Sequence, residues 1–228
     1  MIKTLVSLLK GTRIILVSRD VKFLYKVSKI LKENKINYAE FMPPSGLGPR
    51  SVVITTHKEC ENIEAPLKIC LEEADELRLL VSLAECALSS EGLNVEYVVG
   101  IDPGKNYGLA LIASGILVKG FTVRGLKEAL DLLTSLSRVL GVANYRLKVG
   151  GQISPHELSL LLSSISPRSR IELVNEALSS AKKRLFKELR REVKDEDILS
   201  ACAIALCRGK EIKPPQIEKN DSFSDLSE

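Results

Sequence analysis

The sequence of 228 residues contains no tryptophan, and aromatic residues make up only 4% of it. The hydrophobic core must therefore be built from leucine, isoleucine, valine and alanine. Long apolar runs are also absent: the longest uncharged stretch, Asn106–Val118, contains an asparagine, a serine and two glycines. It falls well short of the ~20 apolar residues that a membrane-spanning helix needs. With 45% hydrophobic and 27% charged residues, the composition excludes disorder of the whole chain and predicts a globular protein with no membrane partner.

Features of secreted and zinc-binding proteins are missing as well. Charges at Lys10 and Arg13 interrupt the N-terminal apolar segment, and no small-residue cleavage site follows it. The five cysteines are an odd number without CxxC spacing, so we expect reduced thiols rather than a disulfide framework. His57, Cys60 and Cys70 lie close in sequence, but no fourth zinc ligand is evident. These absences predict a cytoplasmic protein.

The charge balance is mildly basic. Lysine and arginine number 33 against 29 acidic residues, which gives a formal net charge of +4. A charge of this size is compatible with a nucleic-acid partner and does not by itself require one.

The first segment, residues 1–92, alternates strand and helix patterns. Strands are predicted at Arg13–Ser18, Tyr38–Met42, Ser51–Thr56 and Pro66–Leu71, and helices at Val21–Asn34 and Ala74–Leu88. The Gly/Pro-rich loop Pro43–Arg50 favours a simple connection, with close approach to a phosphate as the alternative. We expect a small α/β accessory domain whose function is not legible from the sequence.

The second segment, residues 93–208, is more regular. Three strands with short turns between them, which predict an antiparallel meander, are expected at Glu96–Asp102, Tyr107–Ala113 and Ile116–Val123. Helices and strands then alternate: Leu126–Leu140, Tyr145–Gly150, His156–Ser163, Ile171–Asn175, Ala181–Val193 and Asp195–Cys207. Strands four and five, each reached through a helix, should lie parallel to strand one. Residues 209–228 lack periodicity and are predicted to be disordered.

Asp102 ends the first of these strands and is followed by Pro103 and Gly104. A carboxylate beside residues of little bulk leaves room for a metal ion and a phosphate at the edge where open α/β sheets place their ligands. Asp-Pro-Gly is equally common as plain turn chemistry, so this motif alone does not decide between a site and a turn.

Three segments carry a resemblance to known families. VVGIDPGKNYGLALIASG (Val98–Gly115) resembles the opening hairpin of the RuvC and YqgF families, which have a G-I-D-x-G strand followed by a G-[LV]-A strand. IELVNEAL (Ile171–Leu178), leading into a serine pair and a helix, is similar to the YqgF pattern of a strand, D-E-R-L-T-[ST] and a helix. DILSACAIA (Asp197–Ala205) resembles that family's D-x-x-A-A-x-x-I-L helix. The segments stand in the expected order over about half of the chain.

The resemblance implies a ribonuclease-H-like fold, a mixed five-stranded sheet flanked by helices, with its acidic triad at Asp102, Glu176 and Asp197. Such carboxylates hold Mg²⁺ or Mn²⁺ in this superfamily, where one ion lowers the pKa of the attacking water and another stabilises the leaving oxygen. The sequence departs from the YqgF pattern at Asn175 and Ala177, where one acid and the arginine are lost.

The departures from RuvC are larger. Strand four ends in Val149–Gly151, without the RuvC glutamate, and Ser200 stands where RuvC carries a late acid, so the YqgF pattern fits better. Asp195 and Glu196 are spare acids that either substitute for Asp197 or cap the last helix, and capping is favoured for Asp195.

Basic side chains near the implied triad suggest contacts with phosphates. Lys183, Lys187, Arg190 and Arg191 would share one face of the predicted helix, either as a nucleic-acid surface or as an ordinary solvated face. Lys105, directly after the catalytic turn, is better placed to touch a scissile phosphate.

His156 at a helix start is expected to be a cap rather than a base.

These patterns together predict a metal-dependent, structure-specific nuclease that acts on branched DNA or structured RNA, as a junction resolvase or an RNA-processing enzyme. A homodimer would suit a symmetric junction. One alternative is a degenerate fold that binds nucleic acid or protein without cutting. A remote one is an actin-like or sugar-kinase ATPase, which also opens with a G-I-D-x-G strand but needs two such domains.

Overall fold

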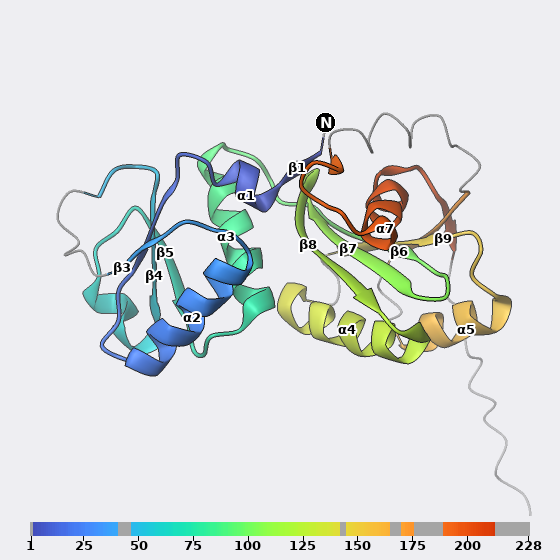
Figure 1. Cartoon of the computed structure of the whole chain (residues 1–228), viewed down its shortest axis with the longest axis horizontal. Coiled ribbons are helices and arrows are strands. Elements are labelled where there is room, and N and C mark those ends of the chain that lie inside the picture. Colours follow the sequence, from blue (N-terminus) through green and yellow to red (C-terminus); the bar gives the residue numbers. More distant parts are fainter. Residues whose placement is uncertain (1, 41–46, 142–144, 165–169, 176–188, 213–228) are drawn as a thin grey trace, which may run out of the picture.

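The computed structural model describes residues 2–40, 47–141, 145–164, 170–175 and 189–212. Its strands form two sheets, one on each side of a central helix (Figure 1). The helices are α1 (Leu5–Leu8), α2 (Val21–Glu33), α3 (Glu76–Ser90), α4 (Gly125–Leu140), α5 (Pro155–Ser164) and α7 (Glu196–Leu206), with a 3₁₀ helix η1 (His57–Asn62). Within the described ranges, no helix is long and apolar enough to cross a membrane.

The smaller sheet has four parallel strands in the order β3-β2-β4-β5. These are β2 (Arg13–Leu16), β3 (Ala39–Glu40), β4 (Ser51–Thr56) and β5 (Leu67–Leu71). The predicted strands and helices of the first segment are all present. The two-domain ATPase alternative would require a second antiparallel meander like that predicted for residues 93–208. The smaller sheet has only parallel pairs and so does not contain one.

The larger sheet has seven strands in the order β1-β8-β7-β6-β9-β10-β11. They are β1 (Lys3–Thr4), β6 (Tyr97–Asp102), β7 (Tyr107–Ala113), β8 (Ile116–Val123), β9 (Tyr145–Gly150), β10 (Arg170–Val174) and β11 (Lys210–Ile212). The meander is antiparallel, and β9 and β10 run parallel to β6. The central five strands therefore have the predicted ribonuclease-H-like order and directions, which confirms the fold class.

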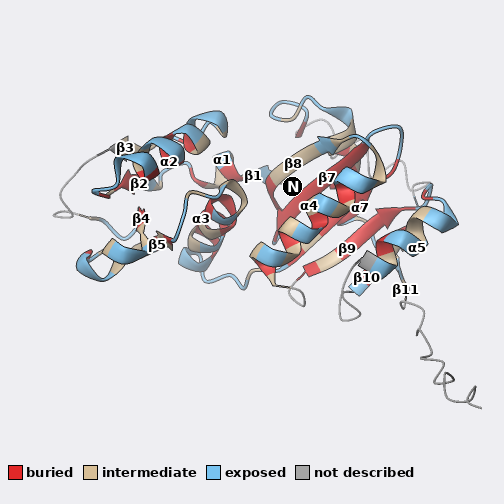
Figure 2. Ribbon diagram, turned by 90° about the horizontal axis from the view of Figure 1, so that it is seen from below, coloured by how far each residue is buried: buried red, intermediate tan, exposed pale blue. Residues whose placement is uncertain are grey.

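Both faces of the larger sheet are covered. Alternate residues of β6 and β7 point to opposite faces, and Val99 and Leu111 belong to an apolar cluster that includes Leu133 and Leu136 of α4. Ala110 belongs instead to a cluster with α7. Figure 1 shows the strands between α7 and α4, and Figure 2 shows that β7 is buried along its length. The sheet is thus the middle layer of three.

Helix α3 joins the two halves. Ile101 of the larger sheet, Leu83 of α3 and Ile54 of the smaller sheet belong to one apolar cluster. Lys119 of β8 also donates hydrogen bonds to Asn34 (2.8 Å) and to Glu76 of α3 (2.9 Å). The division of the chain at residue 92 stays a prediction, since one apolar core extends across it.

Two edge strands of the larger sheet were not predicted. Strand β1 pairs in parallel with β8, so Lys3–Thr4 joins the sheet of the other half. Strand β11 pairs with β10 and lies within 209–228, where no regular structure was expected. Both strands are too short to show a period of two, and their partners are distant in sequence. Residues 213–228 lie outside the described ranges.

The prediction that all cysteines are thiols is wrong for Cys60 and Cys70, which form a disulfide. Helix η1 folds back beside β5, and the two Cα atoms lie 5.8 Å apart, a separation that suits such a bond. The spacing of the cysteines in the sequence does not reveal that the chain folds back here, so the disulfide was not predicted. Cys86, Cys202 and Cys207 are free.

Candidate active site

Helix α7 packs very closely on the larger sheet because glycines line the strands beneath it. A Cβ atom built on Gly100 of β6 would lie 2.2 Å from the carbonyl oxygen of Ala201. One on Gly120 of β8 would lie 2.4 Å from Cγ2 of Ile198. Such contacts are far inside van der Waals distance, so glycine at these positions is what allows the helix to approach.

The same packing brings two predicted site residues together. A Cβ atom on Gly108 of β7 would lie 2.1 Å from the carbonyl oxygen and 3.1 Å from the Cβ of Asp197. Gly108 is the direct antiparallel partner of Asp102, and side chains of opposed residues project to the same face about 4.5–5.5 Å apart. Asp102 and Asp197 therefore both lie on the α7 side of the sheet, with their Cβ atoms within roughly 9 Å of each other. Both are half-buried.

The start of α7 is fixed by Asp195. Its carboxylate accepts hydrogen bonds from the backbone N–H groups of Asp197 (2.9 Å) and Ile198 (3.3 Å). It also accepts one from the Thr122 hydroxyl at the end of β8, at 2.7 Å. The prediction that Asp195 caps the last helix is confirmed. Through Thr122, this cap also holds the first turn of α7, which carries Asp197, against the end of β8.

Glu196 is engaged as well. It forms an ion pair with Arg190 at 3.0 Å, and both side chains are more than half exposed, at 65% and 55%. An exposed pair of this kind contributes little free energy and exchanges readily with other partners. Arg190 thus lies next to the candidate site with a guanidinium that a phosphate could recruit.

The predicted basic helix differs from the structure at its described end. Arg190 and Arg191 lie in a turn, not on a helix. Leu189, 4% exposed, packs into the cluster under α7, and Thr4 donates a hydrogen bond to Glu192. These anchors turn the chain just before α7, which begins at Glu196 after its cap Asp195. Lys183, Lys187 and Glu176 lie outside the described residues, and Lys105 is exposed in the turn between β6 and β7.

A buried ion pair on the α7 face was missed by the sequence analysis. Lys148 of β9 is 7% exposed; its ammonium donates to the Cys207 carbonyl at 2.6 Å and lies 3.3 Å from the Glu172 carboxylate of β10. Cys207 ends α7, so the cation also meets the negative end of the helix dipole. The sequence signal that could have predicted this pair is a lysine and a glutamate at inward-facing positions of neighbouring strands. Glu172, held this way, has a structural role.

His156 lies within a capping box. Ser154 and Glu157 bond reciprocally at the start of α5, with Ser154 N–H donating to Glu157 (3.1 Å) and Glu157 N–H donating to Ser154 (3.2 Å). The buried Tyr107 hydroxyl donates to the same carboxylate at 2.6 Å. Hydrogen bonds from Ser154 and from Tyr107 lower the pKa of Glu157, while burial and the Glu157 carboxylate raise that of Tyr107. The cap is supplied by Ser154 and Glu157, not by His156.

The described part of the chain supplies two of the three expected metal ligands. Carboxylate oxygens are the ligands that Mg²⁺ and Mn²⁺ prefer, so Asp102 and Asp197 suit such an ion chemically. Among the described residues, no group of three histidine, cysteine or acidic side chains is close enough to hold a metal.

Comparison with known proteins yields weak structural likenesses. No family model matches the chain, and neither does any curated protein. The chain is similar to RuvC of Thermus thermophilus, with a TM-score of 0.34 and 18% identity over 51% of this chain and 99% of that one. It is also similar to Argonaute of Marinitoga piezophila, solved with a guide RNA, with a TM-score of 0.27 and 13% identity over 72% of this chain and 39% of that one.

Proposed function

We propose that this chain is a divalent-metal-dependent nuclease that acts on branched DNA or structured RNA, with Asp102, Glu176 and Asp197 as its acidic residues. The observation that carries the proposal is the convergence of Asp102 and Asp197 through Gly108. Residues almost a hundred positions apart are brought to one sheet edge, where open α/β sheets bind their ligands.

The residues would divide the work as follows. Asp102 and Asp197 would hold Mg²⁺ or Mn²⁺, with Glu176 as the third ligand. A bound ion would supply the positive charge that lowers the pKa of the attacking water and stabilises the leaving oxygen. Lys105, exposed in the turn after Asp102, would orient the scissile phosphate, with Arg190 and Arg191 flanking it. Water adds to phosphorus, one backbone P–O bond breaks, and the leaving oxygen takes up a proton.

Cleavage of labelled four-way DNA junctions and RNA hairpins with Mg²⁺ or Mn²⁺ tests this proposal. We expect the unmodified protein to cut at least one substrate. Asp102→Asn and Asp197→Asn should each reduce the rate by roughly 100-fold or more, because each removes a charge that the transition state needs. Glu176→Gln tests the third ligand. Asp131→Asn, on the exposed face of α4, is the matched control and should cut normally.

The outcomes separate the nuclease from its alternative. Loss of cutting in the site variants, with binding and folding retained, supports the proposal. A protein that binds these nucleic acids at low salt but does not cut them with either ion is instead a binding module. That result would also favour the interpretation that this chain has lost catalytic activity, because Asn175 and Ala177 stand where the YqgF pattern has an acid and an arginine.

A further inference from the structure

The outer face of α2 carries apolar side chains that the core does not use. Tyr25 is 70% exposed and Val21 is 76% exposed, one helical turn apart. The opposite side of α2 packs Phe23, Val27 and Leu31 into the core. The helix therefore has its full complement of buried apolar residues, and stability of the fold does not explain an aromatic ring on the outside.

Lysines surround this tyrosine. Exposed lysines on α2 and directly after it are Lys22, Lys26, Lys29, Lys32 and Lys35. Lys22 and Lys29 lie three residues before and four after Tyr25, which places them beside its ring on the same helix face. Glu33 is the only acid within α2; it pairs with Lys29 at 3.8 Å with both side chains exposed, which offsets little of the positive charge.

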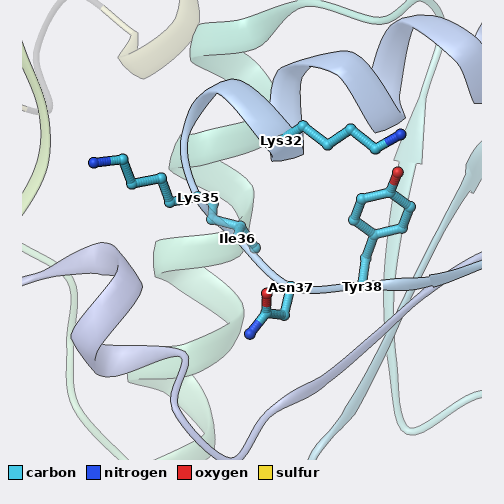
Figure 3. Close-up of a pocket in the computed structure, with 5 residues that line it drawn as sticks. All are labelled: Lys32, Lys35, Ile36, Asn37 and Tyr38. Atoms are coloured by element: carbon cyan, nitrogen blue, oxygen red, sulfur yellow. The ribbon is translucent and has the colours of Figure 1, made fainter.

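The face continues past the end of the helix into a hollow of about 680 Å³ lined by Lys32, Lys35, Ile36, Asn37 and Tyr38. In Figure 3 the Lys32 amine and the Tyr38 phenol extend toward the same place. A second tyrosine thus stands beside the lysines, beyond the C-terminal end of α2. We call this surface, from Lys22 and Tyr25 to Tyr38, the lysine–tyrosine face.

We infer that the lysine–tyrosine face binds single-stranded nucleic acid. Single strands are held by cationic grooves that follow the phosphates and by aromatic side chains on which unpaired bases stack, and this face has both. A duplex would use the lysines but offers no free base to an exposed tyrosine. An anionic membrane surface would need a broad apolar helix face for insertion. The broad apolar face of α2 packs into the core, and its exposed large apolar side chains are Val21 and Tyr25 alone.

This surface is separate from the candidate active site. Helix α2 belongs to the half with the smaller sheet, whereas Asp102 and α7 belong to the other half (Figure 1). The inference goes beyond the proposed nuclease and stands even if the chain does not cut. A strand bound here would connect the accessory half to the same class of polymer that the active site is proposed to process.

Binding of fluorescein-labelled oligothymidylate and oligouridylate tests the inference, using strands of about 20 nucleotides, long enough for a site of ~4–16. Anisotropy titrations use the full chain carrying Asp102→Asn, so that cutting cannot interfere. Tyr25→Ala should weaken binding about 5- to 100-fold through loss of stacking, whereas Tyr25→Phe should retain it. Removing two lysines, as Lys22→Gln with Lys32→Gln, should reduce the slope of log K against log salt by roughly 1.4.

Lys127→Gln on the exposed face of α4 is the matched control and should leave both the affinity and the slope unchanged. Because Tyr25 is largely exposed, its variants should unfold at the same temperature as the parent. The inference is overturned if Tyr25→Ala binds the single strands as well as the parent does. It is equally overturned if a blunt duplex of the same length competes as well as the single strand, or if only anionic vesicles are bound.

Discussion

At the scale of single residues, the geometry of the candidate site depends on glycines, which have no side chain, as much as on its acids. Gly100, Gly108 and Gly120 let α7 approach the sheet closely: a Cβ atom would meet helix backbone atoms at Gly100 and Gly108, and the Ile198 side chain at Gly120. Of these, Gly108 matters most for the candidate site, because it pairs with Asp102 and packs against Asp197. The positions of the acids are therefore set by a residue that has no functional group.

Replacing this glycine should move the helix. Gly108→Ala places a methyl group against the Asp197 backbone, which cannot yield by rotating a side chain. We expect a loss of about 1–3 kcal/mol in the free energy of unfolding and weaker metal-dependent cleavage, measured by urea denaturation and by the junction assay. Gly48→Ala, with nothing within 4 Å of the added atom, is the control. Equal stability of the two variants would contradict the close packing.

At the scale of elements, the first turn of α7 is fixed by specific hydrogen bonds. Asp195 satisfies two backbone N–H groups of the helix and is tied to β8 through Thr122. A helix start fixed from both sides holds the backbone of Asp197 in place.

Removal of the cap should therefore affect both stability and activity. Asp195→Ala is expected to lower the free energy of unfolding by about 1–2 kcal/mol and to raise the Mg²⁺ concentration needed for half-maximal cleavage. Asp75→Ala removes the cap of α3, where the carboxylate accepts from Arg78 N–H at 2.7 Å, and should cost stability alone. If both variants change the Mg²⁺ requirement equally, the cap does not position the site.

At the scale of the whole molecule, a polar network joins the halves beside the shared core. Glu76 of α3 accepts hydrogen bonds from Asn34 and Lys119, at 2.8 and 2.9 Å. Burial by itself would raise the pKa of Glu76, but these hydrogen bonds and the Lys119 charge outweigh it and hold the pKa below its usual value. Ionised Glu76 thus stabilises the junction between the two halves.

The sign of this shift predicts a pH dependence. Since the folded pKa is below the unfolded value near 4.5, the stabilisation is complete above that pH and is lost as the pH falls through the folded pKa. Glu76→Gln should cost about 1 kcal/mol at neutral pH, because the partly exposed group is screened by solvent, and less at pH below 4. Thermal unfolding across this range measures it. Glu33→Gln, in an exposed pair, should show little pH-dependent difference, and a parallel loss in both variants would refute the role of the network.

Local patterns in the sequence were enough for most regular elements, and the crossover rule was enough for the directions of the central five strands of the larger sheet. Strands β4, β7, β8 and β9 match their predicted ranges to the residue, because alternating apolar residues and turn signals are local. The capping role of Asp195 was likewise predictable, since it depends on neighbours within a few positions.

What only the tertiary structure decided are the relations between distant residues. The sequence does not show that Gly108 brings Asp197 to Asp102, that Lys148 is buried against Glu172 and the end of α7, or that Cys60 reaches Cys70. It likewise gives no sign that Lys3–Thr4 and Lys210–Ile212 complete the edges of the larger sheet. Local patterns determine on which face of a strand or helix a residue lies. The packing of α7 and α3 determines which residues of other elements contact that face. The physical reason is that close approach depends on the shapes of both partners, and one stretch of sequence records only one of them.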